Sequence, residues 1–459
     1  MKITFLTVAA AMAVMPVMAQ NKGGLSEETL AGLRSSYENS ASDKAIHNAI
    51  ANVGIDKVAF NVENANNIST DFKYRVPSKG ITNQRSSGRC WLFTGLNVLR
   101  AQAMMEHNLP MLELSQNYNF FYDQLEKANL FLQGMIDNAS KPDNDRMVDW
   151  LFSNALNDGG QFTGVADVIT KYGVVPKGVM AETASSESTS KMRQLLTWKL
   201  REDGLELRKM AADGKKPAEI TKRKNEMLAE VYRILALNLG VPPTEFQWTR
   251  KDKKGNIIDT KTYTPQQFYK EFFGNDLKNN YVMLMNDPTR EYYKMYEIDF
   301  DRHVYDGENW TYLNVPMEDI KKMAIASIKD STAMYFSCDV NKFLNKDLGL
   351  LDPTNYDYAS LLGVGFGMNK AERIKTHSSA SSHAMTLVGV DVNEAGEPTK
   401  WLIENSWGNG ANDGHLIASD RWMDEYLFRL VVERKYVPEN LKKYFNQKPI
   451  MLPAWDFMF

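Results

Sequence analysis

Four residues spread along the 459-residue chain have the types and neighbours that nucleophilic catalysis at a carbonyl group requires. A cysteine thiolate attacks a carbonyl carbon when an imidazole takes its proton, and an amide beside that imidazole fixes which ring nitrogen is free. A second amide, together with a backbone N–H, stabilises the oxyanion that forms. The candidates are Cys90 as nucleophile, His383 as base, Asn405 as orienting amide and Gln84 as oxyanion donor.

Cys90 stands where a turn gives way to a helix. Turn formers occupy residues 86–88, and apolar residues then follow at helical spacing: Leu92, Leu96, Leu99 and Ala103. The dipole and the free N–H groups of a helix N-terminus stabilise a thiolate. The pattern therefore predicts a reactive thiol in the first turn of this helix, with Gln84 on the loop that approaches it.

His383 and Asn405 lie at the two ends of a predicted hairpin. Residues 383–390 and 401–405 have strand character, and residues 393–398 are turn formers. The centre of the turn sets which residue lies opposite His383, and the mean of 383 and 405 is 394. We therefore expect His383 and Asn405 to lie side by side. Trp407, just beyond, could shield the pair from water.

Other interpretations of these residues stay open at this stage. His383 could be a satisfied core histidine, and His377 and His415 flank the predicted site as rival bases. Cys338 lies in a strand-like segment and is predicted to be an inert buried side chain rather than a disulfide partner of Cys90. No one residue carries the prediction alone, because it depends on all four roles occurring together.

In the remaining chain, segments of helical character come first in the sequence and segments of strand character follow. Residues 115–245 have mainly helical periodicity, and residues 246–263 are typical of a β-hairpin. Strand-like segments dominate the last third. Helices followed by antiparallel strands indicate an α+β fold.

Composition excludes several classes of protein. Hydrophobic residues make up 43% and charged residues 24% of the chain, which is typical of a globular protein rather than a disordered one. The formal charge of −3, or −4 once residues 1–19 with their single lysine are removed, makes nucleic-acid binding an unfavoured function. Two cysteines are too few for a cysteine zinc cluster, and we expect neither a metal nor another cofactor.

The first 19 residues have the three parts of a signal peptide. Lys2 supplies a basic start, residues 3–17 form an apolar run, and small residues at 17 and 19 precede a cleavage point before Gln20. The run is short for a membrane span, so a membrane anchor or a buried helix is less favoured. We expect export, to a periplasm or to the exterior, with no membrane span after cleavage.

Several segments resemble papain-type cysteine peptidases. They are Gln-x5-Cys-Trp at residues 84–91, His-Ala-Met at 383–385 and Glu-Asn-Ser-Trp-Gly at 404–408. The interval of 293 residues between Cys90 and His383 is about twice the papain-like one. That interval and Ser-Ser-Gly-Arg-Cys-Trp-Leu-Phe at 86–93 resemble the bleomycin hydrolase/aminopeptidase C family. Further similar segments stand at 114–116, 158–161, 171–174, 368–373 and 452–456, so the resemblance covers about residues 50–459.

The resemblance implies a papain-like α+β fold with an N-terminal helical part, a C-terminal antiparallel β-barrel-like part and a large helical insert. After a signal peptide at 1–19, residues 20–459 form one peptidase unit. Its expected parts are the cysteine helix at about 80–110, the helical insert and hairpin at about 115–265, the β-rich His/Asn part at about 330–440 and the C-terminal arm at about 445–459.

The resemblance also implies thiol-dependent aminopeptidase activity on peptide substrates, in a homohexamer whose active sites face an internal channel. The matched oxyanion, nucleophile, base and orienting residues are Gln84, Cys90, His383 and Asn405, and the matched cleft positions are Gly159 and Gly160. Because no catalytic residue is missing, a peptide-binding oligomer on an inactive papain fold is the less favoured alternative.

The C-terminal arm departs from the family pattern. In the family the arm lies in the cleft and its end blocks subsites, so that substrates must present a free N-terminus. Here Asp456 is followed only by Phe457, Met458 and Phe459. This shorter and bulkier end, with Phe459 at the cleft, either leaves extra subsites open or plugs them with aromatic rings. An endopeptidase and a di- or tripeptide-releasing peptidase therefore stay open beside the aminopeptidase.

Overall fold

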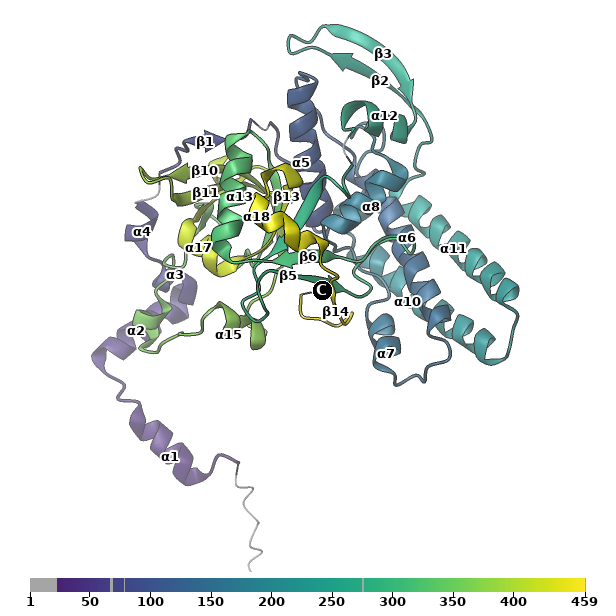
Figure 1. The fold of residues 1–459 in the computed structure, drawn as a ribbon. Helices are drawn as coiled ribbons and strands as arrows, with labels where there is room; N and C mark the ends of the chain where they lie inside the picture. The colour runs from purple at the N-terminus through teal and green to yellow at the C-terminus, as the bar shows by residue number, and fades with distance from the viewer. Residues whose placement is uncertain (1–22, 67–68, 78, 275, 459) are drawn as a thin grey trace, which may run out of the picture.

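The computed structural model describes residues 23–66, 69–77, 79–274 and 276–458 (Figure 1). The predicted signal peptide at residues 1–19 and the predicted cleft residue Phe459 lie outside the described residues. Within the described ranges, no helix combines the length and the apolar character that a membrane span needs.

A mixed sheet of twelve strands forms one half of the molecule. Its strands are joined in the order β14-β5-β6-β4-β13-β7-β10-β11-β12-β9-β8, with β1 paired to β10. Most neighbouring strands are antiparallel, and the parallel pairs are β4 with β6, β5 with β14 and β9 with β12. The bounds are β1 Tyr74–Arg75, β4 Tyr281–Met285, β5 Lys294–Ile298, β6 Thr311–Asn314, β7 Met334–Cys338, β8 Leu344–Asn345, β9 Leu350–Leu351, β10 His383–Val392, β11 Pro398–Glu404, β12 His415–Ser419, β13 Leu427–Glu433 and β14 Ile450–Leu452.

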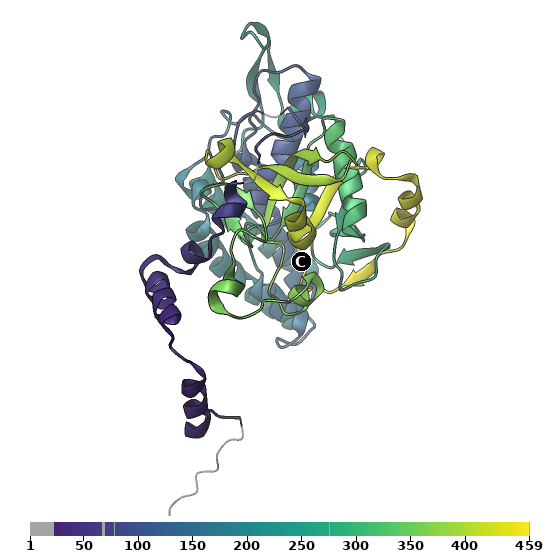
Figure 2. The ribbon, with the colours of Figure 1, turned by 90° about the vertical axis from the view of Figure 1, so that its left-hand side faces the viewer.

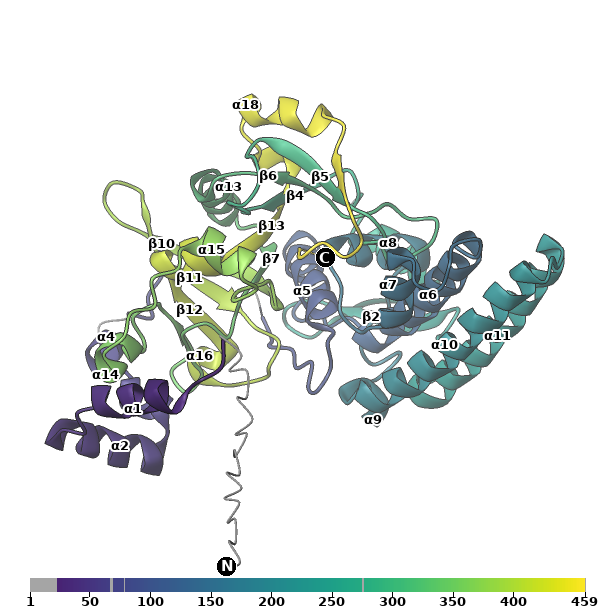
Figure 3. The ribbon, with the colours of Figure 1, turned by 90° about the horizontal axis from the view of Figure 1, so that it is seen from below.

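Helices form the other half and the outer layers of the sheet half (Figure 3). The helical half contains α6 Gln116–Asp137, α7 Arg146–Ser153, α8 Phe162–Tyr172, α9 Ala184–Glu187, α10 Ser190–Ala212, α11 Pro217–Leu239 and α12 Pro265–Phe272, together with the hairpin of β2 Phe246–Lys251 and β3 Ile257–Tyr263. The helices on the sheet half are α13 Met317–Lys329, α14 Tyr358–Leu362, α15 Lys370–Lys375, α16 Ala411–Gly414, α17 Asp420–Tyr426 and α18 Glu439–Lys442.

Four N-terminal helices lead into the sheet half from one side (Figure 2). They are α1 Glu27–Ser36, α2 Ala41–Val53, α3 Ile55–Ala59 and α4 Val62–Asn66. Neither α1 nor α2 has a buried residue, so these two helices contribute nothing to the core of this chain.

Helix α11 illustrates why the helical insert folds as paired helices. Pro217 stands in its first turn, where a missing N–H costs nothing. Its buried side chains form one stripe, Ile220, Met227, Val231, Leu235 and Leu239, which faces α6 and α10. The predicted helical character of 115–245 and the predicted hairpin at 246–263 are both confirmed.

Helix α5 (Cys90–Glu106) lies between the two halves (Figure 3). It packs against α6 and α8 on one side and against β7 and β10 on the other, and most of its residues are buried. Gly95 permits the close approach of α8, because a Cβ there would come within 2.5 Å of Val165. Cys90, the first residue of α5, is therefore held at the junction of the helical half and the sheet half.

Candidate active site

The Cys90 thiol lies at the start of α5, as predicted, and is half-buried. Burial raises the pKa of this thiol, whereas the backbone N–H groups of Ala384 and Trp91 oppose that change. The influence of the Ala384 N–H places the thiol against β10, one residue from His383. Burial and the N–H groups at the helix start therefore act on the pKa of this thiol in opposite directions.

His383 and Asn405 form the pair that the hairpin predicts. Nε2 of His383 lies 2.9 Å from Oδ1 of Asn405. The same oxygen accepts the backbone N–H of Ser406 at 2.8 Å, which identifies it as the acceptor. Nε2 therefore carries the proton, and Nδ1 is left with a free lone pair. Trp407 stacks on the imidazole at a centroid distance of 5.0 Å, where it shields the ring from water.

The hairpin register differs from the simplest expectation but leaves this pair intact. Thr386 pairs with Glu404 and Val392 with Pro398, so the turn is centred at 395 rather than 394. Register shifts between Leu387 and Gly389 and between Asp391 and Val392 adjust the two strands. The side chains beyond the last paired residues still meet, because a shift of one residue is within the reach of the two side chains.

Burial lowers the pKa of His383 to about 4, and its bond to Asn405 opposes the change. Between about pH 6.5 and pH 4 this histidine is therefore protonated in the unfolded chain but not in the folded chain. The free energy of unfolding falls as the pH drops through this window.

We expect this histidine to lower the free energy of unfolding by about 3 kcal/mol between pH 7 and pH 4. Denaturant titrations at both pH values should show that loss reduced in His383→Gln. The exposed His47→Gln serves as control, and an equal loss in wild type and His383→Gln would contradict the prediction.

Gln84 is held by Ser406, the residue after Asn405. The Gln84 backbone N–H donates to the Ser406 carbonyl at 2.8 Å, and the Ser406 hydroxyl donates to Oε1 of Gln84 at 2.7 Å. One hydrogen of Nε2 is used by the Ser87 carbonyl at 2.7 Å, which leaves the second for another acceptor. The contact of Ser406 with Gln84 is not predicted from the sequence, in which only its position beside Asn405 distinguishes this serine.

The helical half braces the cysteine loop through Asp158. The indole of Trp91 donates to the Asp158 carbonyl at 2.9 Å, and the Gly88 N–H donates to the Asp158 carboxylate at 2.8 Å. A Cβ at Gly160 would collide with the ring of His303 and lie 2.9 Å from Trp91, so this position requires glycine. Gly159 has open space instead, with only Asn157 at 3.7 Å.

The end of the C-terminal arm is buried between the two halves (Figure 3). Arg290 binds Asp456 at 2.5 Å, and the buried Arg429 of β13 donates to the carbonyl of Met458. Arg429 and the Cys90 thiol both act electrostatically on the hydroxyl of Tyr335, so the arm is anchored near the thiol.

The other candidate residues serve other contacts. Cys338 is fully buried with a free thiol that donates to the carbonyl of His383 at 3.8 Å, so it is buried as predicted and forms no disulfide with Cys90. The ring of His377 contacts Phe457, and Nδ1 of His415 lies 3.1 Å from the Asn412 carbonyl. In the part of the chain that the structure describes, no cluster of three or more His, Cys, Asp or Glu could hold a metal.

A half-buried thiol at a helix start, beside a histidine–asparagine pair and between a helical half and a sheet, defines the class of papain-type cysteine peptidases. The chain belongs to the Peptidase C1-like family, whose model matches residues 24–459, and the resemblance seen in the sequence is thereby confirmed.

Relatives and a solved structure are similar over most of their length. Bleomycin hydrolase of Mus musculus is 40% identical over 401 residues, which is 84% of this chain and 88% of the relative. Aminopeptidase C of Listeria monocytogenes is 39% identical over 420 residues, 91% of this chain and 94% of the relative. The crystal structure of PepW from Lactobacillus rhamnosis HN001 has a TM-score of 0.92 at 35% identity, covering 95% of this chain and 99% of that one.

Proposed function

We propose that this chain is a thiol-dependent aminopeptidase, which hydrolyses peptide bonds from free N-termini through an acyl-enzyme. The observation that carries the proposal is the His383–Asn405 pair at 2.9 Å, which leaves Nδ1 of the imidazole free. The backbone N–H of Ala384, the next residue, acts on the half-buried thiol at the start of α5. Relatives named aminopeptidase C and bleomycin hydrolase support the same activity.

In the proposed reaction the Cys90 sulfur attacks the scissile carbonyl carbon as its proton passes to Nδ1 of His383. Burial disfavours the charged form of both groups, since it raises the pKa of the thiol and lowers that of the imidazole. The Gln84 amide and the Cys90 backbone N–H would bind the oxyanion. The imidazolium then protonates the leaving amine, and His383 activates a water that hydrolyses the thioester and restores the thiol.

The arm supports cleavage at chain ends. Its last described residue, Met458, is 1% exposed and is held by Arg429, which lies close to the same Tyr335 hydroxyl as the thiol. An arm fixed in this place would close one side of the proposed substrate cleft, so that a long peptide could not pass across the thiol. The free α-amine would then be the part of the substrate that meets this barrier.

The test compares one fluorogenic peptide with a free α-amine and its N-acetylated twin, using residues 20–459 under reducing conditions and Cys90→Ala as the blank. We expect hydrolysis of the free-amine form and no measurable turnover of the acetylated one. Cleavage of both forms would make the chain an endopeptidase, and release of two or three residues at a time would make it a di- or tripeptide-releasing enzyme. If neither form is hydrolysed, the alternative of an inactive peptide-binding oligomer is favoured.

We also propose that the chain is exported after cleavage before Gln20 and that it assembles as a homohexamer. The first rests on the signal-like pattern of residues 1–19, and the second on the family resemblance alone. N-terminal sequencing of the natural protein and light scattering of the mature form are the direct checks.

A further inference from the structure

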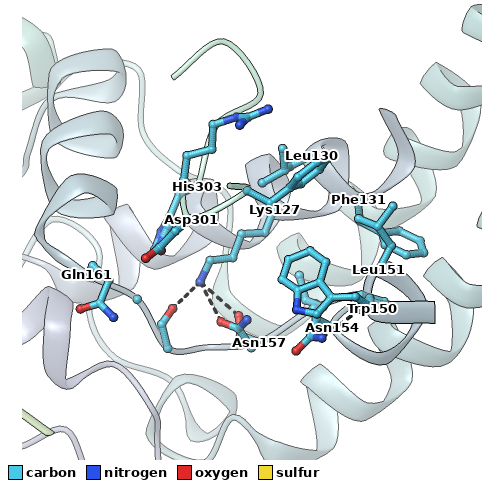
Figure 4. Close-up of a pocket in the computed structure, with 16 residues that line it drawn as sticks. Lys127, Leu130, Phe131, Trp150, Leu151, Asn154, Asn157, Gln161, Asp301 and His303 are labelled. Carbon is cyan, nitrogen blue, oxygen red and sulfur yellow. Dashed lines mark hydrogen bonds between the residues drawn. The ribbon is translucent and has the colours of Figure 1, made fainter. Parts of the chain in front are cut away.

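A cavity of about 240 Å³ lies beside Gly159 and Gly160, between α6, α7 and the loop after β5 (Figure 4). One end is polar and carries Asp301, Lys127 and His303. The opposite end is mainly apolar and is lined by Leu130, Phe131, Trp150 and Leu151, with the amide of Asn154 beside Trp150. The cavity thus offers charged groups and an apolar wall within one enclosure.

Asp301 has a buried carboxyl oxygen without a partner. The residue is 5% exposed, and its Oδ2 has no hydrogen bond among the described residues. Its backbone is fixed, because the backbone N–H of Trp310 donates to the Asp301 carbonyl at 2.6 Å and the Asp301 N–H donates to the Ile298 carbonyl at 3.3 Å. Burial raises the pKa of this carboxyl to about 7, while Arg429 and Lys127 oppose the change. A buried carboxyl oxygen without a hydrogen bond is costly, and a cation that donates to it offsets that cost.

The side chains of Lys127 and His303 at the polar end already have partners. Arg302 also lines the cavity, and its buried Nε has no partner among the described residues. The ammonium of Lys127 donates to the Gly159 carbonyl at 2.5 Å and lies 3.1 Å from Asp123. Nδ1 of His303 lies 2.5 Å from the same Asp123. Asp301 is therefore left as an acceptor that these side chains do not satisfy.

Contacts with Trp91 connect the cavity to the proposed catalytic site. Gly160, in the cavity wall, packs on the indole of Trp91, which is the neighbour of Cys90. On the same indole, the His303 ring packs edge-on at a centroid distance of 4.7 Å, and the Lys127 ammonium lies 5.4 Å from the ring centroid. The polar end of the cavity is thus the end next to Trp91.

We propose that Asp301 binds the α-ammonium group of the peptide substrate and that the apolar wall takes the side chain of the same N-terminal residue. The inference rests on the proposed aminopeptidase function and names its substrate class, peptides that begin with an apolar residue. An apolar residue at a peptide N-terminus has an ammonium group next to an apolar side chain. These two groups match the carboxyl and the apolar wall of the cavity. A lysine or arginine side chain fits less well, because its charged tip would lie against the apolar wall when the α-ammonium is at Asp301.

The test measures peptide binding in the Cys90→Ala background, where nothing is turned over. Isothermal titration with a leucine-initiated tetrapeptide amide and with its N-acetylated form gives the preference for a free amine. Removing one partner of a buried charge pair should weaken binding of the free-amine peptide about 30-fold or more, so we expect that loss in Asp301→Asn. The acetylated peptide should bind Asp301→Asn and the parent equally weakly. Asp301→Ser is made alongside, so that the result does not depend on the folding of one variant.

Glu308→Gln is the matched control, because it removes a carboxylate from an exposed position in the same loop. Unchanged free-amine preference in Asp301→Asn would overturn the proposal, as would tighter binding of a lysine-initiated peptide than of the leucine-initiated one. The outcome is separable from that of the proposed function. If the wild type is active and Asp301→Asn keeps the free-amine preference, only the role of Asp301 is wrong. If the wild type is inactive but binds free amines through Asp301, only the aminopeptidase function is wrong.

Discussion

Replacing Cys90 with alanine is expected to lower kcat/KM by about 10⁴-fold or more while leaving the fold intact. Without the sulfur no acyl-enzyme can form, and the oxyanion donors and the binding contacts supply only the residual rate. The fold should persist because Cys90 is half-buried at the first position of α5 and alanine is the best helix former. Kinetics and a denaturant titration on the same preparation check both parts.

Cys338→Ala is the matched control for this result. It removes the only other thiol of the sequence, from a strand directly behind His383. The cavity left in the core should lower stability by about 1 kcal/mol or more, with most of the activity retained. A thiol-alkylating probe should label wild type and Cys338→Ala but not Cys90→Ala. Full activity in Cys90→Ala would remove Cys90 from the mechanism.

Gln84→Ala is expected to lower kcat by about 10²–10³-fold with little change in KM. The reason is that the oxyanion exists only in the transition state, so a donor aimed at it adds little to binding of the ground state. Ser406→Ala should cause a smaller loss, about three- to tenfold, because it removes the 2.7 Å hydrogen bond that holds Oε1 of Gln84.

The double variant distinguishes orientation from an independent role. If Ser406 acts by positioning the Gln84 amide, Gln84→Ala with Ser406→Ala should be no slower than Gln84→Ala alone. Gln133→Ala, which removes the same type of side chain from the surface of α6, should retain wild-type kcat. A rise in KM at constant kcat in Gln84→Ala would place this residue in substrate binding instead of oxyanion stabilisation.

Much of the local structure around the site could be predicted from the sequence. The change from turn formers to helical spacing located the start of α5 at Cys90. Residue spacing around one turn brought His383 and Asn405 together, even though bulges moved the register by a residue. These features depend on neighbours that are close in the sequence, so periodicity and turn composition contain them.

Only the tertiary structure determined the burial, the pKa shifts and the long-range contacts of these residues. The thiol meets β10 because α5 packs between α8 and the sheet, and the resulting burial raises the pKa of Cys90 where the helix start alone predicts the opposite. The Ser406 hydroxyl reaches Gln84 across 322 residues of chain. Oδ2 of Asp301 is buried without a hydrogen bond among the described residues, where segments from distant parts of the sequence meet. Burial and long-range contacts come from packing of whole elements, and no local pattern of residues encodes the set of neighbours that packing produces.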